Sequence, residues 1–69
     1  MSAYYVNNTA QWNGDHEVHE EGCHWLSLAS NTSFLGYFDH CSDAVAKSKR
    51  DHHQQSNGCA TCSRECHTG

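Results

Sequence analysis

Strand-like residues dominate three short segments of the chain. Residues 34–38 combine aromatic and apolar side chains and predict a β-strand. Gly36 has no side chain to pack, and therefore favours a bulge within that strand. Residues 3–7 and 16–19 are two further candidate strands. In residues 16–19 the alternation places Val18 toward the core and directs Glu17 and His19 to the opposite face.

A helical pattern follows these segments. Small and apolar residues recur at positions 41, 44, 45 and 48, which is the spacing of one helix face. We expect Asp39 to cap the N-terminus of this helix and Cys41 to be a buried, reduced residue on its apolar face. The pattern ends over residues 51–55, and we expect Asn57 or Gly58 to supply a left-handed C-cap.

Turn signals separate the predicted elements. Asn13-Gly14 is a strong turn dipeptide, and residues 30–33 are polar and turn-like. The predicted order is three strands, one helix and a cysteine-rich tail. We therefore expect a single domain over residues 1–69 of the α+β class, with a short mixed or antiparallel sheet and one α-helix.

The chain is too small and too polar to fold on apolar burial alone. It has 69 residues, 36% of them hydrophobic, and its mean hydropathy is −0.83. A domain of this size buries only about 60% of the surface that its unfolded chain exposes. Small scaffolds with so limited a core need a covalent or metal cross-link. The length also excludes two-domain enzymes with a cofactor cleft.

Net charge and targeting patterns restrict the possible functions and compartments of the protein further. The formal charge of −4 disfavours a general nucleic-acid binder, and we interpret Lys47, Lys49 and Arg50 as a solvated helix face. The sequence has no signal-peptide pattern and no apolar run long enough to span a membrane. We therefore expect a cytoplasmic protein with mostly reduced cysteines. The odd number of cysteines, five, also favours metal binding over disulfides.

Two closely spaced ligand pairs predict a metal site. Cys59 and Cys62 have the spacing with which two thiolates grip one tetrahedral Zn²⁺ ion. His19 and Cys23 form a second pair, whose side chains can converge across the turn at residues 20–22. We therefore expect a Cys₃His zinc site made by His19, Cys23, Cys59 and Cys62. Binding would close a loop from residue 23 to residue 59.

Alternative ligands and chemistries compete with this site. Cys66 or His67 could replace His19 as the fourth ligand. Cys59 and Cys62 could instead form a thiol redox pair, but the chain lacks the βαβ context of that motif. His16 and His19 resemble the start of a metalloprotease motif, which the lack of a long helix and of a third histidine excludes. We assign no catalytic residue.

The combination of these features resembles the small zinc domain at the N-terminus of the Ada DNA-repair protein. The likeness covers residues 3–63 and includes His19-x3-Cys23, the aromatic strand, the helix with Ala44 and Val45, and Gly58-Cys59-x2-Cys62. It implies Zn²⁺ on a small mixed sheet with one helix. In Ada the first ligand is a nucleophilic cysteine. His19 stands at that position here, so the resemblance does not carry the repair activity with it.

These observations favour a non-enzymatic, zinc-stapled module that binds a macromolecular partner, most simply a protein. The net negative charge fits an acidic accessory or inhibitor protein of a phage or bacterium. Its contact residues would come from the aromatic side chains Tyr4, Tyr5, Trp12 and Tyr37. The alternatives are a metal-handling protein for zinc or copper and an Ada-like DNA-associated domain.

Overall fold

The sheet contains the three strands that the sequence pattern predicts and one more. The computed structural model describes residues 1–68. Its strands are β1 (Ser2–Asn7), β2 (His16–Glu20), β3 (Thr32–Phe38) and β4 (Ser56–Gly58). The strand order is β3-β1-β2-β4; β1 is antiparallel to β3 and β2, and β2 is parallel to β4. The result is a small mixed sheet.

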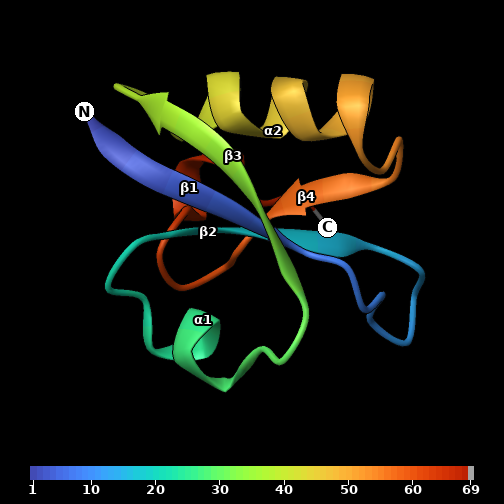
Figure 1. Ribbon diagram of the computed structural model, residues 1–69. Coiled ribbons are helices and arrows are strands. Elements are labelled where there is room, and N and C mark those ends of the chain that lie inside the picture. Colours follow the sequence, from blue (N-terminus) through green and yellow to red (C-terminus); the bar gives the residue numbers. More distant parts are fainter. Residues whose placement is uncertain (69) are drawn as a thin grey trace.

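Helices lie on both faces of this sheet. The main helix, α2 (Cys41–Asp51), covers one face, and the five-residue helix α1 (His24–Leu28) lies on the other side (Figure 1). A single 3₁₀ turn, η1 (Arg64–Cys66), follows β4 near the end of the chain. With one main helix and a four-stranded mixed sheet, the molecule has the predicted α+β fold.

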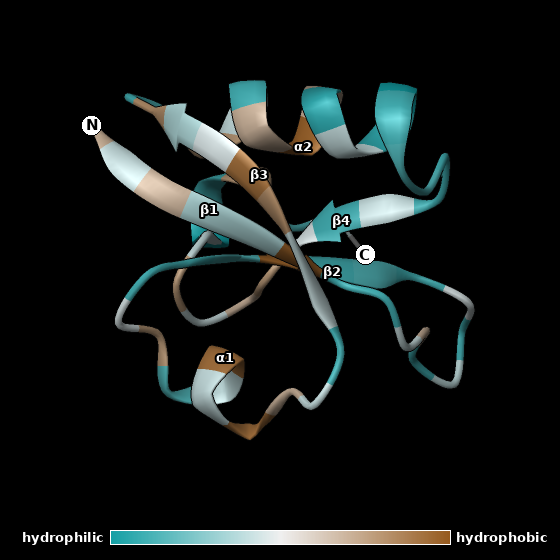
Figure 2. Ribbon diagram, in the orientation of Figure 1, coloured by the Kyte–Doolittle hydropathy of each residue, from teal (hydrophilic) through white to brown (hydrophobic). Residues whose placement is uncertain are grey.

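The hydrophobic core lies between the sheet and α2. Its buried residues come from β1, β2, β3 and α2: Tyr4, Val6, Val18, Leu35 and Ala44. The side of α2 that faces the sheet carries its most hydrophobic positions, while its outer side is hydrophilic (Figure 2). Val18 is fully buried in this core. The predicted strand alternation is therefore confirmed, and His19 is directed to the opposite face.

Gly36 forms the predicted irregularity in β3. Its φ of +131° lies in the region that favours glycine, and the pairing of β1 with β3 shifts register between Tyr4 and Tyr5. The bulge adds one residue to β3 relative to β1. As a result Phe34 and Tyr37, which are three positions apart, pack against each other with their ring centroids 5.5 Å apart.

The ends of the main helix differ from the prediction. His40, and not Asp39, directly precedes α2, and its side chain makes no capping hydrogen bond. Asn57 and Gly58 do not form a C-cap. They belong to β4, and within residues 1–68 neither has a positive φ. The helix ends at Asp51 because the following segment turns back and pairs with β2, a tertiary contact that overrides the local C-cap signal.

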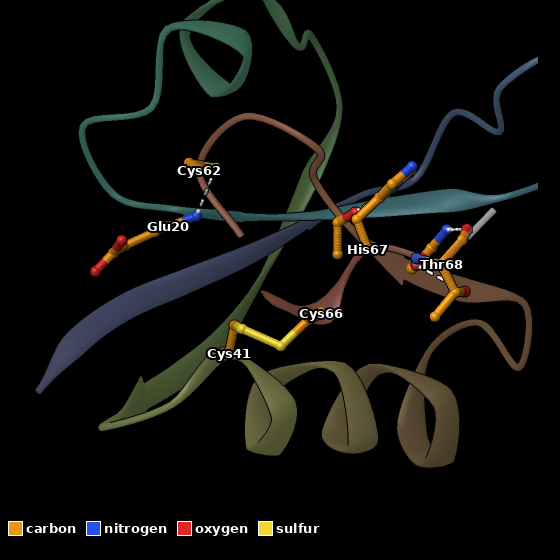
Figure 3. The surroundings of a disulfide bond; sticks show 8 residues. Glu20, Cys41, Cys62, Cys66, His67 and Thr68 are labelled. Carbon is orange, nitrogen blue, oxygen red and sulfur yellow. Dashed lines mark hydrogen bonds between the residues drawn. A yellow bond between two sulfur atoms is a disulfide. The ribbon is translucent and has the colours of Figure 1, made fainter. Parts of the chain in front are cut away.

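Cys41 is bonded to Cys66, which corrects the expectation of a reduced core cysteine. The disulfide joins the first residue of α2 to the last residue of η1 (Figure 3). Cys41 still packs against the core, as the helix pattern indicated. The expectation of mostly reduced cysteines holds for the other three, Cys23, Cys59 and Cys62, which are free.

Candidate metal centre

Four side chains from three parts of the chain meet on the face of the sheet opposite α2. His19 lies on β2, Cys23 directly precedes α1, and Cys59 and Cys62 follow β4. One donor atom from each residue lies within 4.8 Å of all the others, and three of the four side chains are buried. The structure thus brings together all four residues that the sequence analysis selected, in a cluster that could hold a metal ion.

The turn between β2 and α1 places Cys23 beside His19. Gly22 has a φ of +85°, and the Cys23 N–H donates to the Glu20 carbonyl at 3.1 Å. This tight turn returns the chain toward β2, so that the Cys23 Sγ lies 3.7 Å from the His19 Nδ1. The convergence predicted for this pair is confirmed.

Parallel pairing of β2 and β4 places the second pair of cysteines. The Cys59 N–H donates to the Val18 carbonyl at 2.9 Å, which extends the ladder to the residue before His19. The Ser63 N–H then donates to the Cys59 carbonyl at 2.9 Å, and this turn brings Cys62 back toward the sheet. The Cys62 Sγ lies 3.8 Å from the His19 Nδ1 and accepts the Glu20 N–H at 3.4 Å (Figure 3).

These separations fit a tetrahedral ion. With Zn–S bonds of about 2.3 Å and a Zn–N bond of about 2.1 Å, a tetrahedron has N–S edges of about 3.6 Å. The two measured distances from the His19 Nδ1 to sulfur, 3.7 and 3.8 Å, are close to that value. The donor set of three thiols and one imidazole is also one that structural zinc sites use.

The protonation of the cluster reflects its burial. His19 is 1% exposed, and burial lowers its pKa, so the ring is neutral and can donate a lone pair. Burial and hydrogen bonds with Cys23 and Cys59 raise the pKa of Cys62 to about 12. Burial also acts to raise the pKa of Cys23. Hydrogen bonds from the Cys62 thiol and from the Leu26 backbone outweigh this effect and hold the pKa below its usual value.

Neither alternative fourth ligand belongs to the cluster. Cys66 is in the disulfide, and the His67 Nδ1 lies 3.0 Å from the Gly58 carbonyl, to which it donates. His24 is exposed and packs edge-on against Trp25. The metal-ligand role proposed for Cys66 or His67 in place of His19 is therefore not supported by their positions.

Sequence reasoning missed a stacking contact between two histidine rings outside the cluster. The rings of His16 and His53 stack with centroids 3.6 Å apart and an interplanar angle of 2°. The His53 Nε2–H donates to the Asn8 side chain, and the His16 Nδ1–H donates to the Asn7 carbonyl. No spacing rule pairs residues 37 positions apart in this way, so the sequence held no signal for it.

The aromatic residues on the surface are only in part the ones that the sequence predicted. Tyr4 is buried in the core, whereas Trp12 and Tyr37 are exposed. Phe34 and Trp25, which the sequence analysis did not select, are about half exposed. The Trp25 indole N–H donates to the Thr61 hydroxyl at 3.0 Å, so α1 is tied to the Cys59–Cys62 turn beside the cluster.

Comparisons with protein-family models, with curated proteins and with solved structures found no match for this chain. Among residues 1–68, no helix has the length and apolar character required to cross a membrane.

Proposed function

We propose that this protein is a non-enzymatic zinc-binding module in which one Zn²⁺ ion holds the fold together and which acts by binding a protein partner. The observation that carries the proposal is the cluster of four donor atoms within 4.8 Å of one another. Three thiolates and one imidazole suit zinc. Four protein ligands complete a tetrahedron and leave no open position for a substrate, which supports a structural role over a catalytic one.

A structural ion would supply the stability that the core lacks. The core cluster has five buried residues, two of which are valines and one an alanine. Structural zinc contributes apparent binding free energies of about 10–16 kcal/mol in small peptides. An ion at this site would connect the β2–α1 turn to the segment after β4. It would therefore cross-link two segments that lie far apart in the sequence.

An exposed row of aromatic rings supports the binding of a protein partner. Tyr5, Phe34 and Tyr37, here called the aromatic row, lie on β1 and β3, with successive ring centroids 5.3 and 5.5 Å apart. Phe34 is 48% and Tyr37 64% exposed. Aromatic side chains are enriched at protein–protein interfaces. β3 is an edge strand, so the row is also accessible from the side of the sheet.

Charge supports a protein partner over nucleic acid. The formal charge is −4 with neutral cysteines. Three thiolates and one Zn²⁺ would add a net charge of about −1, because the site is formed by anionic sulfurs around a divalent ion. Phosphate backbones are bound mainly by lysine and arginine. The same charge argues against transferring an Ada-like role on DNA, as does the histidine at position 19.

Metal content tests the structural part of the proposal. Native mass spectrometry of protein purified without a histidine tag should find one tightly bound Zn²⁺ per chain. Circular dichroism should show loss of the fold when a chelator removes it. A metal-free chain that stays folded would overturn the proposal. Two or more exchangeable ions, together with a fold that survives chelation, would instead support a metal-handling function for this chain of 5 Cys and 7 His.

Paired variants test the binding part. Tyr37→Ser removes one ring of the aromatic row, and Trp12→Ser removes a ring that is 95% exposed in the loop between β1 and β2. In an extract of the source organism, a specific partner should be retained by the wild-type and Trp12→Ser proteins. It should be lost with Tyr37→Ser and displaced by excess untagged wild type. Equal retention by all three proteins would exclude the aromatic row as the interface.

A further inference from the structure

Glu17 is a partly buried carboxylate beside the candidate metal centre. It lies on β2 two positions before His19, so the two side chains share the face of the sheet opposite the core. Its side chain is only 20% exposed. A carboxylate in such a place costs free energy unless it interacts with a polar or charged group.

The two ring nitrogens of His19 face different groups. The Nδ1 lies 3.7 and 3.8 Å from the sulfurs of Cys23 and Cys62. The Nε2 lies 4.0 Å from a carboxylate oxygen of Glu17. The ring is therefore placed between the other metal donors on one side and an acceptor for its remaining N–H on the other.

We infer that Glu17 is a positioning residue for the metal centre: it fixes the His19 tautomer that carries its proton on Nε2 and leaves Nδ1 free for the ion. This inference rests on the proposed zinc site. Histidines that bind metals usually donate their second N–H to a carboxylate, carbonyl or water, and losing that acceptor typically weakens metal binding by about 10–100-fold. At 4.0 Å the two atoms are too far apart for a direct hydrogen bond, and one water that bridges the Nε2–H to the carboxylate would complete the interaction.

Glu17 borders a hollow that is large enough to admit water. Glu17, Trp25, Cys59 and Thr61 are among the residues that line a hollow of about 270 Å³ beside the cluster. The other acidic residues of this region are placed differently. Glu21 accepts the Ala3 N–H at 3.1 Å, and Glu20 lines a separate hollow with Tyr4 and Cys62. Among these three acids, Glu17 is the one that faces the free nitrogen of His19.

Zinc affinity, measured by competition with a chromophoric chelator, tests the inference. Glu17→Ala should bind Zn²⁺ about 10–100-fold more weakly than wild type. Glu17→Gln keeps an acceptor oxygen and should lose less. Glu20→Ala and Glu20→Gln remove the same charge from the same strand, and should stay close to wild type. An unchanged affinity in Glu17→Ala, or an equal loss in Glu20→Ala, would overturn the inference.

Nuclear magnetic resonance gives a readout that does not depend on a variant. In the zinc-loaded wild type, long-range proton–nitrogen correlations should show a proton on the His19 Nε2 and the ion on Nδ1. An ion on Nε2 would overturn the assignment. If the wild type fails to bind zinc, the proposed function fails together with this inference. Normal binding by both wild type and Glu17→Ala overturns the inference alone.

Discussion

His19 is the most deeply buried residue of the candidate metal centre. It is the largest of the fully buried side chains, and its burial favours the neutral ring that a metal ion requires. Without an ion, the Nδ1 of this buried imidazole would have only thiols beside it, and thiols are weak hydrogen-bonding partners. This combination of burial and weak partners suits a ligand better than a packing residue.

Cys59→Ser tests whether the buried cysteines act in structure. Cys59 is 2% exposed and offers one of the four donor atoms. We expect this variant to lose stoichiometric Zn²⁺ and to be unfolded at 25 °C, because the apolar core cannot replace the binding free energy. Native mass spectrometry and circular dichroism measure both effects. A folded variant that lacked only thiol turnover would instead indicate a redox function.

His53 predicts a loss of stability in mild acid. Burial, together with the nearby His16 and His52, lowers its pKa in the folded protein. The unfolded chain therefore binds the proton more readily, and the stability that the neutral ring supports is lost as pH falls through about 6.5, the ordinary histidine pKa. Urea unfolding at pH 7.5 and pH 5.5 should show this loss.

His53→Gln provides the control for that measurement, because it keeps a hydrogen-bonding side chain and cannot be protonated. Its free energy of unfolding should depend less steeply on pH than that of wild type. The residues of the candidate metal centre are the same in both proteins, so any contribution that they make to the pH dependence is common to the two. Parallel pH profiles for the two proteins would contradict the assignment to His53.

At the scale of elements, sequence patterns could predict what depends on local periodicity. β1, β2 and β3 follow from alternation and aromatic content, and α2 from the recurrence of small residues. β4 could not be predicted in this way, since Ser56, Asn57 and Gly58 have no apolar side chain. It is a strand because its backbone pairs with β2, and that pairing is decided by the tertiary structure.

Gly58 in β4 lies against Ser63 and Cys66, and this contact leaves no room for a side chain at position 58. A Cβ at this position would lie 2.7 Å from the Cys66 Cβ and 2.8 Å from the Ser63 carbonyl oxygen. Gly58→Ala should therefore destabilise the fold by about 1–3 kcal/mol, the usual cost of overpacking. Chemical denaturation measures the change. Gly22→Ala is the matched control: its Cβ would meet no atom within 4 Å, but Gly22, unlike Gly58, has a positive φ, so the two variants separate steric crowding from backbone strain.

A buried pair of hydroxyls connects α2 to β4. The Ser48 and Ser56 Oγ atoms are 2.7 Å apart, and the Ser56 hydroxyl donates to the His53 carbonyl at 2.6 Å. Ser48→Ala removes one hydrogen bond of this chain and should cost about 1 kcal/mol in the free energy of unfolding. Ser42→Ala, on the exposed side of the same helix, should have little effect. Equal effects of the two variants would contradict the role given to Ser48.

At the scale of the whole molecule, two different cross-links restrain the C-terminal segment. The candidate metal centre uses Cys59 and Cys62, and the disulfide joins Cys66 to Cys41 across 25 positions. The spacing of ligand pairs favoured His19, Cys23, Cys59 and Cys62 among the 5 Cys and 7 His, and only the structure removed Cys66 and His67 as alternatives to His19. The disulfide could not be predicted, because it depends on where η1 packs against α2 and not on the spacing of its cysteines.

Removing the disulfide should lower stability without abolishing metal binding. In the chain-entropy model, a loop closed across 25 positions is worth about 3.5 kcal/mol. The double variant Cys41→Ala/Cys66→Ala should therefore melt at a lower temperature while still binding one Zn²⁺ per chain. Calorimetry and native mass spectrometry measure the two properties. Loss of the ion in this variant would show that the two cross-links depend on each other.

The parallel pairing of β2 with β4 has a consequence for synthesis. His19 and Cys23 leave the ribosome well before Cys59 and Cys62, so the nascent chain first carries half a site, with two donors instead of four. The second half becomes available only when the chain has been made through residue 62. Because a domain generally folds as a unit during translation, an ion could complete this site only after residue 62 has emerged.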